Sequence, residues 1–353
     1  ATSVATLYSS ATASTGQPAV AWRSVGANGG QVATFAYDLA RSVVGTHQGN
    51  QAWAGQERDA QTPIRSDDLY FGGTGVTDWL DLGKVQIPQA DEQQRLLANL
   101  LTVMRRDRMP LPRFWYFPDT TKAVVVATGD DHGNGGTAGR FDSYLASSPT
   151  GCSVSAWTCP RFTSYVYTST PFSNAQASTY AGQGFEIGLH HSTDCGDYSS
   201  LSSLQSSYSS QLAAWRAKYS SLPSPVSNRT HCIVFSDWSS QPRAELANGI
   251  RLDTNYYFWP GTWIQDRPGF MNGSGIPMRF TDTDVDDRRL PDPDGDDRRV
   301  EPELPVHAEH AARPGPRPPR LLRRLHRQHA HRLRHHLREH PAARLGAGAG
   351  GAA

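Results

Sequence analysis

The amino-acid composition changes abruptly near residue 280, and this change limits how much of the chain can build a folded core. Phe280 is the last aromatic residue, and no Ser, Thr, Asn, Ile, Met, Lys or Cys follows Thr283. The segment 284–353 consists mainly of Arg, His, Pro, Asp, Ala, Gly and Leu, and it holds eight of the 13 histidines. A segment this rich in proline and charge cannot bury a normal core, so it is predicted to be a disordered tail.

Three interpretations of this low-complexity tail, residues 284–353, compete. It is a natural segment that binds metal or anions, a basic arm for nucleic acid, or the product of a reading-frame error. With suitable codons, moving the frame by one base turns VDDRRLPD into Ser-Thr-Ile-Asp-Val-Tyr-Gln, a strand-like string of ordinary protein. Two further segments of the tail change in the same way, so we favour the frame error and do not interpret its histidines as ligands. The nucleotide sequence of the gene tests this.

Length and charge narrow the class of protein. A chain of 353 residues holds two domains or one large one, and no apolar run is long enough to cross a membrane. The formal net charge of +1 argues against a dedicated nucleic-acid surface, so no nucleic-acid partner is expected. Three lysines against 31 arginines indicate a GC-rich genome of the actinobacterial kind.

Cysteine usage points to an oxidising compartment. The chain has four cysteines, and Cys152 and Cys159 bracket a short loop that a disulfide can close. An even number of cysteines, in a chain rich in Ser, Thr, Tyr and Gly, favours a secreted protein that is extracellular or associated with the cell wall. The alternative is four reduced, partly buried thiols.

The sequence before the tail divides into two expected parts joined by a linker. Residues 1–105 contain a strand that runs into a short helix at GGQVATFAYDLARSVV, and an amphipathic helix at QADEQQRLLANLLTVMRRD. Residues 106–121 form a linker with several aromatic and proline residues. In residues 122–283 predicted strands alternate with predicted helices, which indicates an α/β fold with a mainly parallel sheet, closed or nearly closed as a barrel. In such folds the chemistry gathers at the carboxyl ends of the strands.

Two adjacent aspartates, Asp130 and Asp131, end the predicted buried strand KAVVVATGDD. Side chains alternate along a strand, so the two carboxylates point to opposite sides. One carboxylate can hold a divalent cation while the other acts as a base on a nearby water. The alternative is a solvated turn in which both carboxylates cap backbone N–H groups.

A second cluster of polar residues ends another apolar strand. The strand EIGL runs into His190 and His191, and Asp194 lies four residues after His190. A histidine and an aspartate at this spacing can close on one ion, and mixed nitrogen and oxygen ligands suit zinc, manganese or cobalt. His191 is the rival ligand, and a capped surface loop is the alternative interpretation of the histidine pair.

Together these motifs resemble those of the polysaccharide deacetylase family, whose members remove acetyl groups from chitin oligomers, peptidoglycan or xylan. The family fold is a distorted (β/α) barrel, and its first motif, Thr-Phe-Asp-Asp-Gly, corresponds to Thr128–His132. The resemblance implies that Asp130 is the catalytic base and that Asp131 and His190 bind a divalent metal, zinc before manganese or cobalt. Asp194 stands where the family has a second ligand histidine.

The remaining motifs of that family are altered in this chain. Arg229, in NRTHC, occupies the place of the arginine that orients the catalytic aspartate, and His231 is an additional ligand or acid. Asp253 and Trp259 lie in the region of a motif that shapes the substrate pocket. The histidine that acts as general acid in the family has no counterpart in the given reading frame. The resemblance therefore implies an incomplete barrel.

Residues 1–105 resemble the closing part of a glutamine-amidotransferase-like α/β module, which precedes a deacetylase-like domain in some actinobacterial secreted proteins. No cysteine precedes Cys152, so this part carries no amidotransferase nucleophile. A structural or carbohydrate-facing role is expected for it.

Two functions follow from these observations. The first is a metal-dependent hydrolase that removes acetyl groups from a glycan, with Tyr257 and Trp259 stacking on sugar rings unless they serve ordinary packing. The second is a non-catalytic carbohydrate-binding relative that keeps the fold and has lost the chemistry. The intact Asp130–Asp131 pair and EIGLH favour the first function, and the altered motifs favour the second.

Overall fold

Two β-sheets of different type contain all the named strands of the described chain. The structure is a computed structural model, and it describes residues 1–10, 12–106, 121–256, 269–270 and 272–282. One sheet has three strands and the other five. Tyr257, Trp259 and the low-complexity tail lie outside the described residues.

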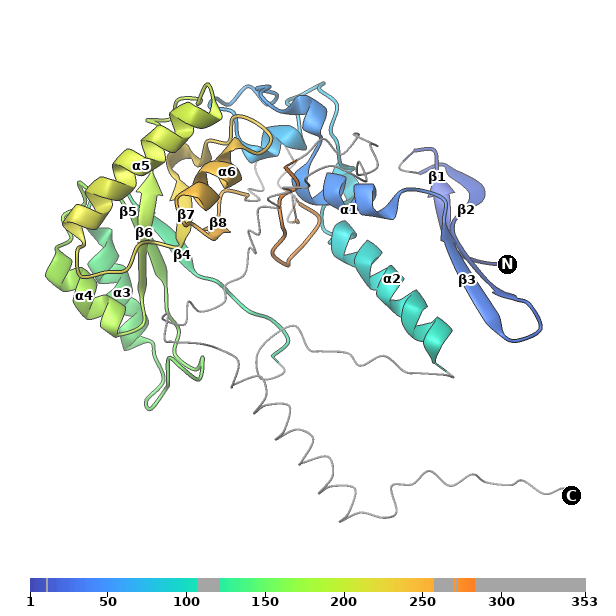
Figure 1. Cartoon of the computed structure of the whole chain (residues 1–353), viewed down its shortest axis with the longest axis horizontal. Coiled ribbons are helices and arrows are strands. Elements are labelled where there is room, and N and C mark those ends of the chain that lie inside the picture. The colour runs from blue at the N-terminus through green and yellow to red at the C-terminus, as the bar shows by residue number, and fades with distance from the viewer. Residues whose placement is uncertain (11, 107–120, 257–268, 271, 283–353) are drawn as a thin grey trace, which may run out of the picture. The chain divides into compact units, whose positions relative to one another are not determined.

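The first sheet is antiparallel and is followed by helices (Figure 1). Its strands pair in chain order and are β1 Thr2–Tyr8, β2 Ser14–Val25 and β3 Gly30–Phe35. Helix α1, Leu39–Gln48, begins at Asp38, whose side chain accepts a hydrogen bond from the N–H of Arg41 at 3.0 Å. Helix α2 spans Gln89–Arg105. The predicted strand-to-helix segment and the predicted amphipathic helix are both confirmed.

Short 3₁₀ helices occupy part of the chain between α1 and α2. They are η1 Gln51–Trp53, η2 Ser66–Leu69 and η3 Leu82–Lys84. All four residues of η2 are buried, so this stretch belongs to the interior.

The second sheet is parallel, and its five strands pair in the order of the sequence. The strands are β4 Thr128–Asp131, β5 Thr163–Val166, β6 Glu186–His191, β7 Ser227–Thr230 and β8 Leu252–Asp253. The helices that connect them are α3 Gly136–Ala146, α4 Asn174–Gly182, α5 Leu201–Lys218 and α6 Ser240–Ala247. This alternation confirms the predicted α/β fold with a parallel sheet, which here forms a five-stranded half-barrel.

Two predicted strands are shorter than expected. The first was expected from residue 122, but only Thr128–Asp131 form β4, and Val125 is 90% exposed. The second was expected at HCIVFSDW, but β7 ends at Thr230 and a 3₁₀ turn, η5 His231–Ile233, follows. Cys232 and Ile233 have φ of 57° and 56°, which is incompatible with a continuing strand.

The main core lies between the parallel sheet and its helices. Helix α5 buries Leu204, Tyr208, Leu212 and Trp215, which are spaced three or four residues apart and so share one face. These side chains belong to one cluster of buried residues with Phe141 of α3 and with side chains of β5 and β6. This core therefore holds the helices against the parallel sheet.

A second core joins the N-terminal part to the parallel sheet. It contains Leu69, Tyr70 and Phe71 from the first part and Phe235, Trp238, Met278 and Phe280 from the second. Gln48 also pairs with Thr281, donating to its carbonyl at 3.0 Å and accepting from its N–H at 2.8 Å. The expected division into residues 1–105, 106–121 and 122–283 therefore stays a prediction, as does the amidotransferase-like origin of the first part.

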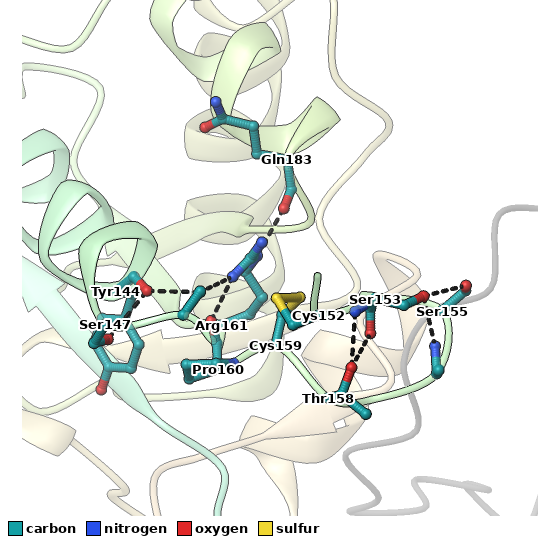
Figure 2. The surroundings of a disulfide bond; sticks show 12 residues. Tyr144, Ser147, Cys152, Ser153, Ser155, Thr158, Cys159, Pro160, Arg161 and Gln183 are labelled. Carbon is teal, nitrogen blue, oxygen red and sulfur yellow. Dashed lines mark hydrogen bonds between the residues drawn. A yellow bond between two sulfur atoms is a disulfide. The ribbon is translucent and has the colours of Figure 1, made fainter. Parts of the chain in front are cut away.

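All four cysteines form disulfides. Cys152 pairs with Cys159, as the spacing predicted, and Cys195 pairs with Cys232. Figure 2 shows the first of these at the base of a short loop, where Thr158 accepts a hydrogen bond from the N–H of Ser153 at 2.7 Å. Both bridges fit the predicted oxidising compartment.

Candidate metal centre

Three histidines meet at the carboxyl ends of the parallel strands. His132 follows β4, His190 lies in β6 and His231 follows β7, and the ligand nitrogens of the three lie within 4.8 Å of one another. Because parallel strands present their carboxyl ends at one edge, residues far apart in sequence converge there. We call this group the histidine cluster. His190 is buried and His132 is exposed, so the cluster reaches from the interior to solvent.

His190 has the hydrogen-bonding state of a metal ligand. Its Nδ1 lies 2.8 Å from the backbone carbonyl of Arg229, which only accepts, so Nδ1 carries the proton and the lone pair is on Nε2. Nε2 is buried and has no hydrogen-bond partner among the described residues. Burial lowers the pKa of His190 to about 3, so the ring is neutral at pH 7. A backbone partner on the second nitrogen is how proteins orient ligand histidines.

Tyr167 packs against all three histidines. Its ring centroid lies 5.0 Å from that of His190, 5.5 Å from that of His231 and 5.8 Å from that of His132. The rings of His132 and His190 are stacked on each other at 5.0 Å. Tyr167 follows β5, so a side chain from β5 or its following loop packs against the histidines that come from β4, β6 and β7.

Asp130 lies beside the histidine cluster and pairs with Arg229. Its Oδ2 is 3.1 Å from the Nε of Arg229, and its Oδ1 is 4.0 Å from the Nδ1 of His190. Burial raises the pKa of Asp130, and the Arg229 charge opposes that rise. The expected contact between Asp130 and Arg229 is therefore present. A carboxylate therefore lies beside the histidine cluster and is held there by an arginine.

Asp131 points the other way and closes the turn before α3. Its Oδ1 accepts hydrogen bonds at 3.1 Å from three successive N–H groups, those of residues 133 to 135. Its Oδ2 accepts from the N–H of Thr137 at 2.9 Å and from its hydroxyl at 2.7 Å. Burial raises the pKa of Asp131, but these hydrogen bonds outweigh it and lower the pKa overall. Asp131, expected as a metal ligand, is thus engaged in capping and is not part of the histidine cluster.

His191 and Asp194, the two other expected ligands, also lie outside the histidine cluster. His191 faces α5, where its Nε2 is 2.9 Å from the hydroxyl of Ser207 and its ring stacks on Tyr208 at 3.8 Å. Asp194 is exposed, with φ of 54°, and its carboxylate accepts a 3.4 Å hydrogen bond from Ser192. Neither side chain therefore contributes a ligand atom to the histidine cluster.

Asp253, at the end of β8, belongs to a buried polar network. One of its oxygens accepts from the N–H of Asn255, and Asn255 in turn accepts from the N–H of Thr230 at 2.8 Å. Glu245 of α6 lies in the same network and accepts from Asn228 at 2.8 Å. Burial raises the pKa of Glu245 far above its usual range. The network fixes the end of β7, from which Arg229 and His231 project.

His132 and Tyr167 were not among the predicted site residues, although the alternation of strands points to both. Asp130 and His132 are two residues apart and share one side, whereas Asp131 faces the opposite side. Tyr165 of β5 and Tyr167 are also two residues apart, so they too are expected on one side of the sheet. His231 was considered as an additional ligand, and the structure brings it into the cluster.

Two further groups of described side chains have ligand atoms close together. Cys195, His231 and Cys232 form one, and Glu57, Asp59 and Asp68 form the other, which we call the carboxylate cluster. No helix in the described part of the chain is long and apolar enough to span a membrane. Comparison with protein-family models, curated proteins and solved structures gave no match to this chain.

Proposed function

We propose that this chain is a metal-dependent hydrolase of the polysaccharide deacetylase kind, built around the histidine cluster. The observation that carries the proposal is the unpartnered, buried Nε2 of His190, which lies within 4.8 Å of ligand nitrogens from His132 and His231. Three histidines are a common ligand set of catalytic zinc sites, which keep a fourth position open for water or substrate. Zinc is therefore the proposed ion, with manganese or cobalt as alternatives.

The residues around the cluster supply the rest of the chemistry. A divalent ion, when bound there, polarises a carbonyl oxygen and acidifies water. Asp130 takes up the proton of the attacking water, because its carboxylate lies beside the histidine cluster, 4.0 Å from the Nδ1 of His190. Arg229 fixes the orientation of Asp130 through the 3.1 Å ion pair. Tyr167 holds the three imidazole rings in place by packing against them.

The proposed substrate is an acetylated glycan, acted on outside the cell. The order of the motifs along the chain and their resemblance to the deacetylase family support this class of substrate. The two disulfides support an extracellular or cell-wall location. Completion of the family's barrel, and stacking of Tyr257 and Trp259 on sugar rings, belong to the same proposal.

Acetate release tests the catalytic function. We expect the zinc-loaded protein to release acetate from N-acetylglucosamine oligomers, and Asp130→Asn to release about 10²- to 10⁴-fold less, the usual contribution of a general base. The matched control is His191→Asn, because His191 adjoins His190 but faces α5. Equal activity of the Asp130→Asn and unmodified proteins would remove Asp130 from the mechanism.

The second candidate function is glycan binding without chemistry. It is favoured by one observation, namely that neither Asp131 nor Asp194 is part of the histidine cluster. Binding of the same oligomers by the unmodified protein and by Asp130→Asn, with no acetate released by either, would select this function.

A further inference from the structure

The two residues after His231 have backbone conformations that their side chains rarely allow. His231 opens the 3₁₀ turn η5, and the next two residues, Cys232 and Ile233, both have positive φ. A β-branched residue such as Ile233 rarely adopts this conformation. Residues in such regions persist only where the surrounding structure over-determines them. Contacts from other parts of the chain must therefore hold this turn in place.

A disulfide ties this turn to the strand that carries His190. Cys195 follows β6 by four residues and is bonded to Cys232, with 5.4 Å between their Cα atoms. The sulfur atoms of both cysteines lie within 4.8 Å of a ring nitrogen of His231. The bridge thus packs against the imidazole and connects the loops of two members of the histidine cluster.

The N-terminal part of the chain holds the same turn from another direction. The Nε of Arg65 donates a 2.9 Å hydrogen bond to the carbonyl of Cys232, and Arg65 forms an antiparallel bridge with Val234. The N–H of Phe235 also donates to the carbonyl of Ile64 at 2.9 Å. Backbone and side-chain bonds from residues 64 and 65 therefore fix the residues that directly follow His231.

We propose that the Cys195–Cys232 disulfide and Arg65 are positioning groups for His231, and that they set the affinity of the histidine cluster for its ion. This inference rests on the proposed function. It makes the N-terminal part a component of the metal centre, because Arg65 belongs to that part. Loss of either restraint releases the turn toward ordinary backbone angles and moves the imidazole away from the other two.

Cobalt binding measures this directly, since Co²⁺ in a zinc-type site absorbs visible light and activity is not needed. The variants are Cys195→Ser/Cys232→Ser and Arg65→Gln, with His231→Ala as the benchmark for complete loss of the ligand. The matched control is Cys152→Ser/Cys159→Ser, which removes the loop disulfide of Figure 2. We expect the Cys195/Cys232 variant to bind Co²⁺ about 10- to 100-fold more weakly than the unmodified protein, the range for partners that orient a ligand.

The control pair should bind Co²⁺ as the unmodified protein does. Unchanged affinity in a folded Cys195/Cys232 variant would overturn the inference, and so would an equal loss in the control. No Co²⁺ binding by the unmodified protein would instead overturn the proposed function, and the inference with it. Circular dichroism establishes folding in each case.

A second measurement applies if the Cys195/Cys232 variant does not fold. The Co²⁺-loaded Cys152→Ser/Cys159→Ser protein is treated with a water-soluble phosphine, which leaves Cys195–Cys232 as the reducible bond. The phosphine takes the oxygen of one water and becomes a phosphine oxide, while the two hydrogens reduce the two sulfurs to thiols. We expect the Co²⁺ affinity to fall in step with thiol release, and a constant affinity after full reduction would refute the positioning role.

Discussion

The histidine cluster and the carboxylate cluster are alike in spacing and differ in what their ligand atoms already do. In the histidine cluster the Nε2 of His190 is buried and has no partner among the described residues. In the carboxylate cluster, five of the six oxygens of the described side chains accept a hydrogen bond, and Glu57 Oε2 is the exception. Nearness of acidic groups is thus a weaker sign of an ion site than a buried nitrogen lone pair without a hydrogen-bond partner.

The carboxylate cluster has a different task, which is to shape a loop. Asp68 accepts from the N–H groups of Arg58 at 2.7 Å and Arg65 at 2.9 Å, and so closes the chain around residues 58 to 65. This loop presents Arg65 to the turn that carries His231. In the proposed arrangement the histidine cluster binds the ion, and the carboxylate cluster holds the loop that restrains His231.

Loss of a histidine ligand should separate the two clusters most strongly, through its effect on metal binding. We expect His190→Ala to weaken Co²⁺ binding by more than about 100-fold, because loss of a ligand exceeds the 10- to 100-fold effect of losing a partner of a ligand. Asp59→Asn should leave the affinity unchanged. Titration of each protein with Co²⁺, followed by absorbance, checks this. The opposite pattern would reverse the roles of the clusters.

Removal of the ion should lower stability through the histidine cluster alone. At an ion concentration of about 100 times Kd, binding stabilises the folded state by about 2.7 kcal/mol, and a chelator removes this. Urea unfolding with and without chelator should show that difference in the unmodified protein and in Asp59→Asn. His190→Ala should show no difference, and a chelator effect that persists in it would place the ion elsewhere.

Loss of the Asp68 carboxylate should cost stability even when no ion is bound. Asp68→Ala leaves the partly buried N–H groups of Arg58 and Arg65 without their acceptor. A fully buried unsatisfied donor costs about 1–3 kcal/mol, so we expect a loss toward the lower end of that range. Urea unfolding of the chelator-treated protein measures this loss. A stability equal to that of the unmodified protein would mean that water replaces the carboxylate at no cost.

The carboxylate cluster should also make the free energy of unfolding depend weakly on pH. Burial, reinforced by the neighbouring acids, raises the pKa of Asp59 to about 6. The folded state therefore holds a proton that the unfolded state releases at a lower pH, so the contribution of this group to stability falls as the pH rises from about 4 to about 6. Asp59→Asn should remove part of this slope. His191→Asn should make the fall steeper, because burial lowers the pKa of His191 to about 3 and its contribution to stability rises with pH in the same range. Urea unfolding at several pH values measures the slope in each variant and in the unmodified protein.

Much of the fold could be predicted from the sequence, because the alternation of strands and helices depends on local periodicity. That pattern located α2, α5 and β6, and it placed Asp130 and His190 at strand ends. It overextended the strand before Thr128, because a run of alanine and valine predicts a strand whether or not a partner strand is present. The β4 residues pair with β5, whereas residues 122–127 are not part of the sheet.

The candidate site was less predictable, because its third ligand depends on long-range contacts. HCIVF reads locally as a strand, and the turn that it forms instead is fixed by Cys195 and by Arg65, 37 and 167 residues before Cys232. Spacing predicted the Cys152–Cys159 bridge, which closes a loop of neighbours, but it cannot pair cysteines that far apart. The different roles of Asp130 and Asp131 follow from strand alternation, but which of them faces the site does not.

The sequential order of the parallel strands also bears on how the centre forms during synthesis. Each strand from β5 to β8 pairs with the strand that precedes it in the sequence, so the strands that carry or precede His132, His190 and His231 can pair in the order in which the ribosome adds them. Cys195 and Arg65 are already present when His231 emerges. All the residues assigned to the histidine cluster and its restraints precede residue 283, so an altered reading frame beyond that point leaves every one of them encoded.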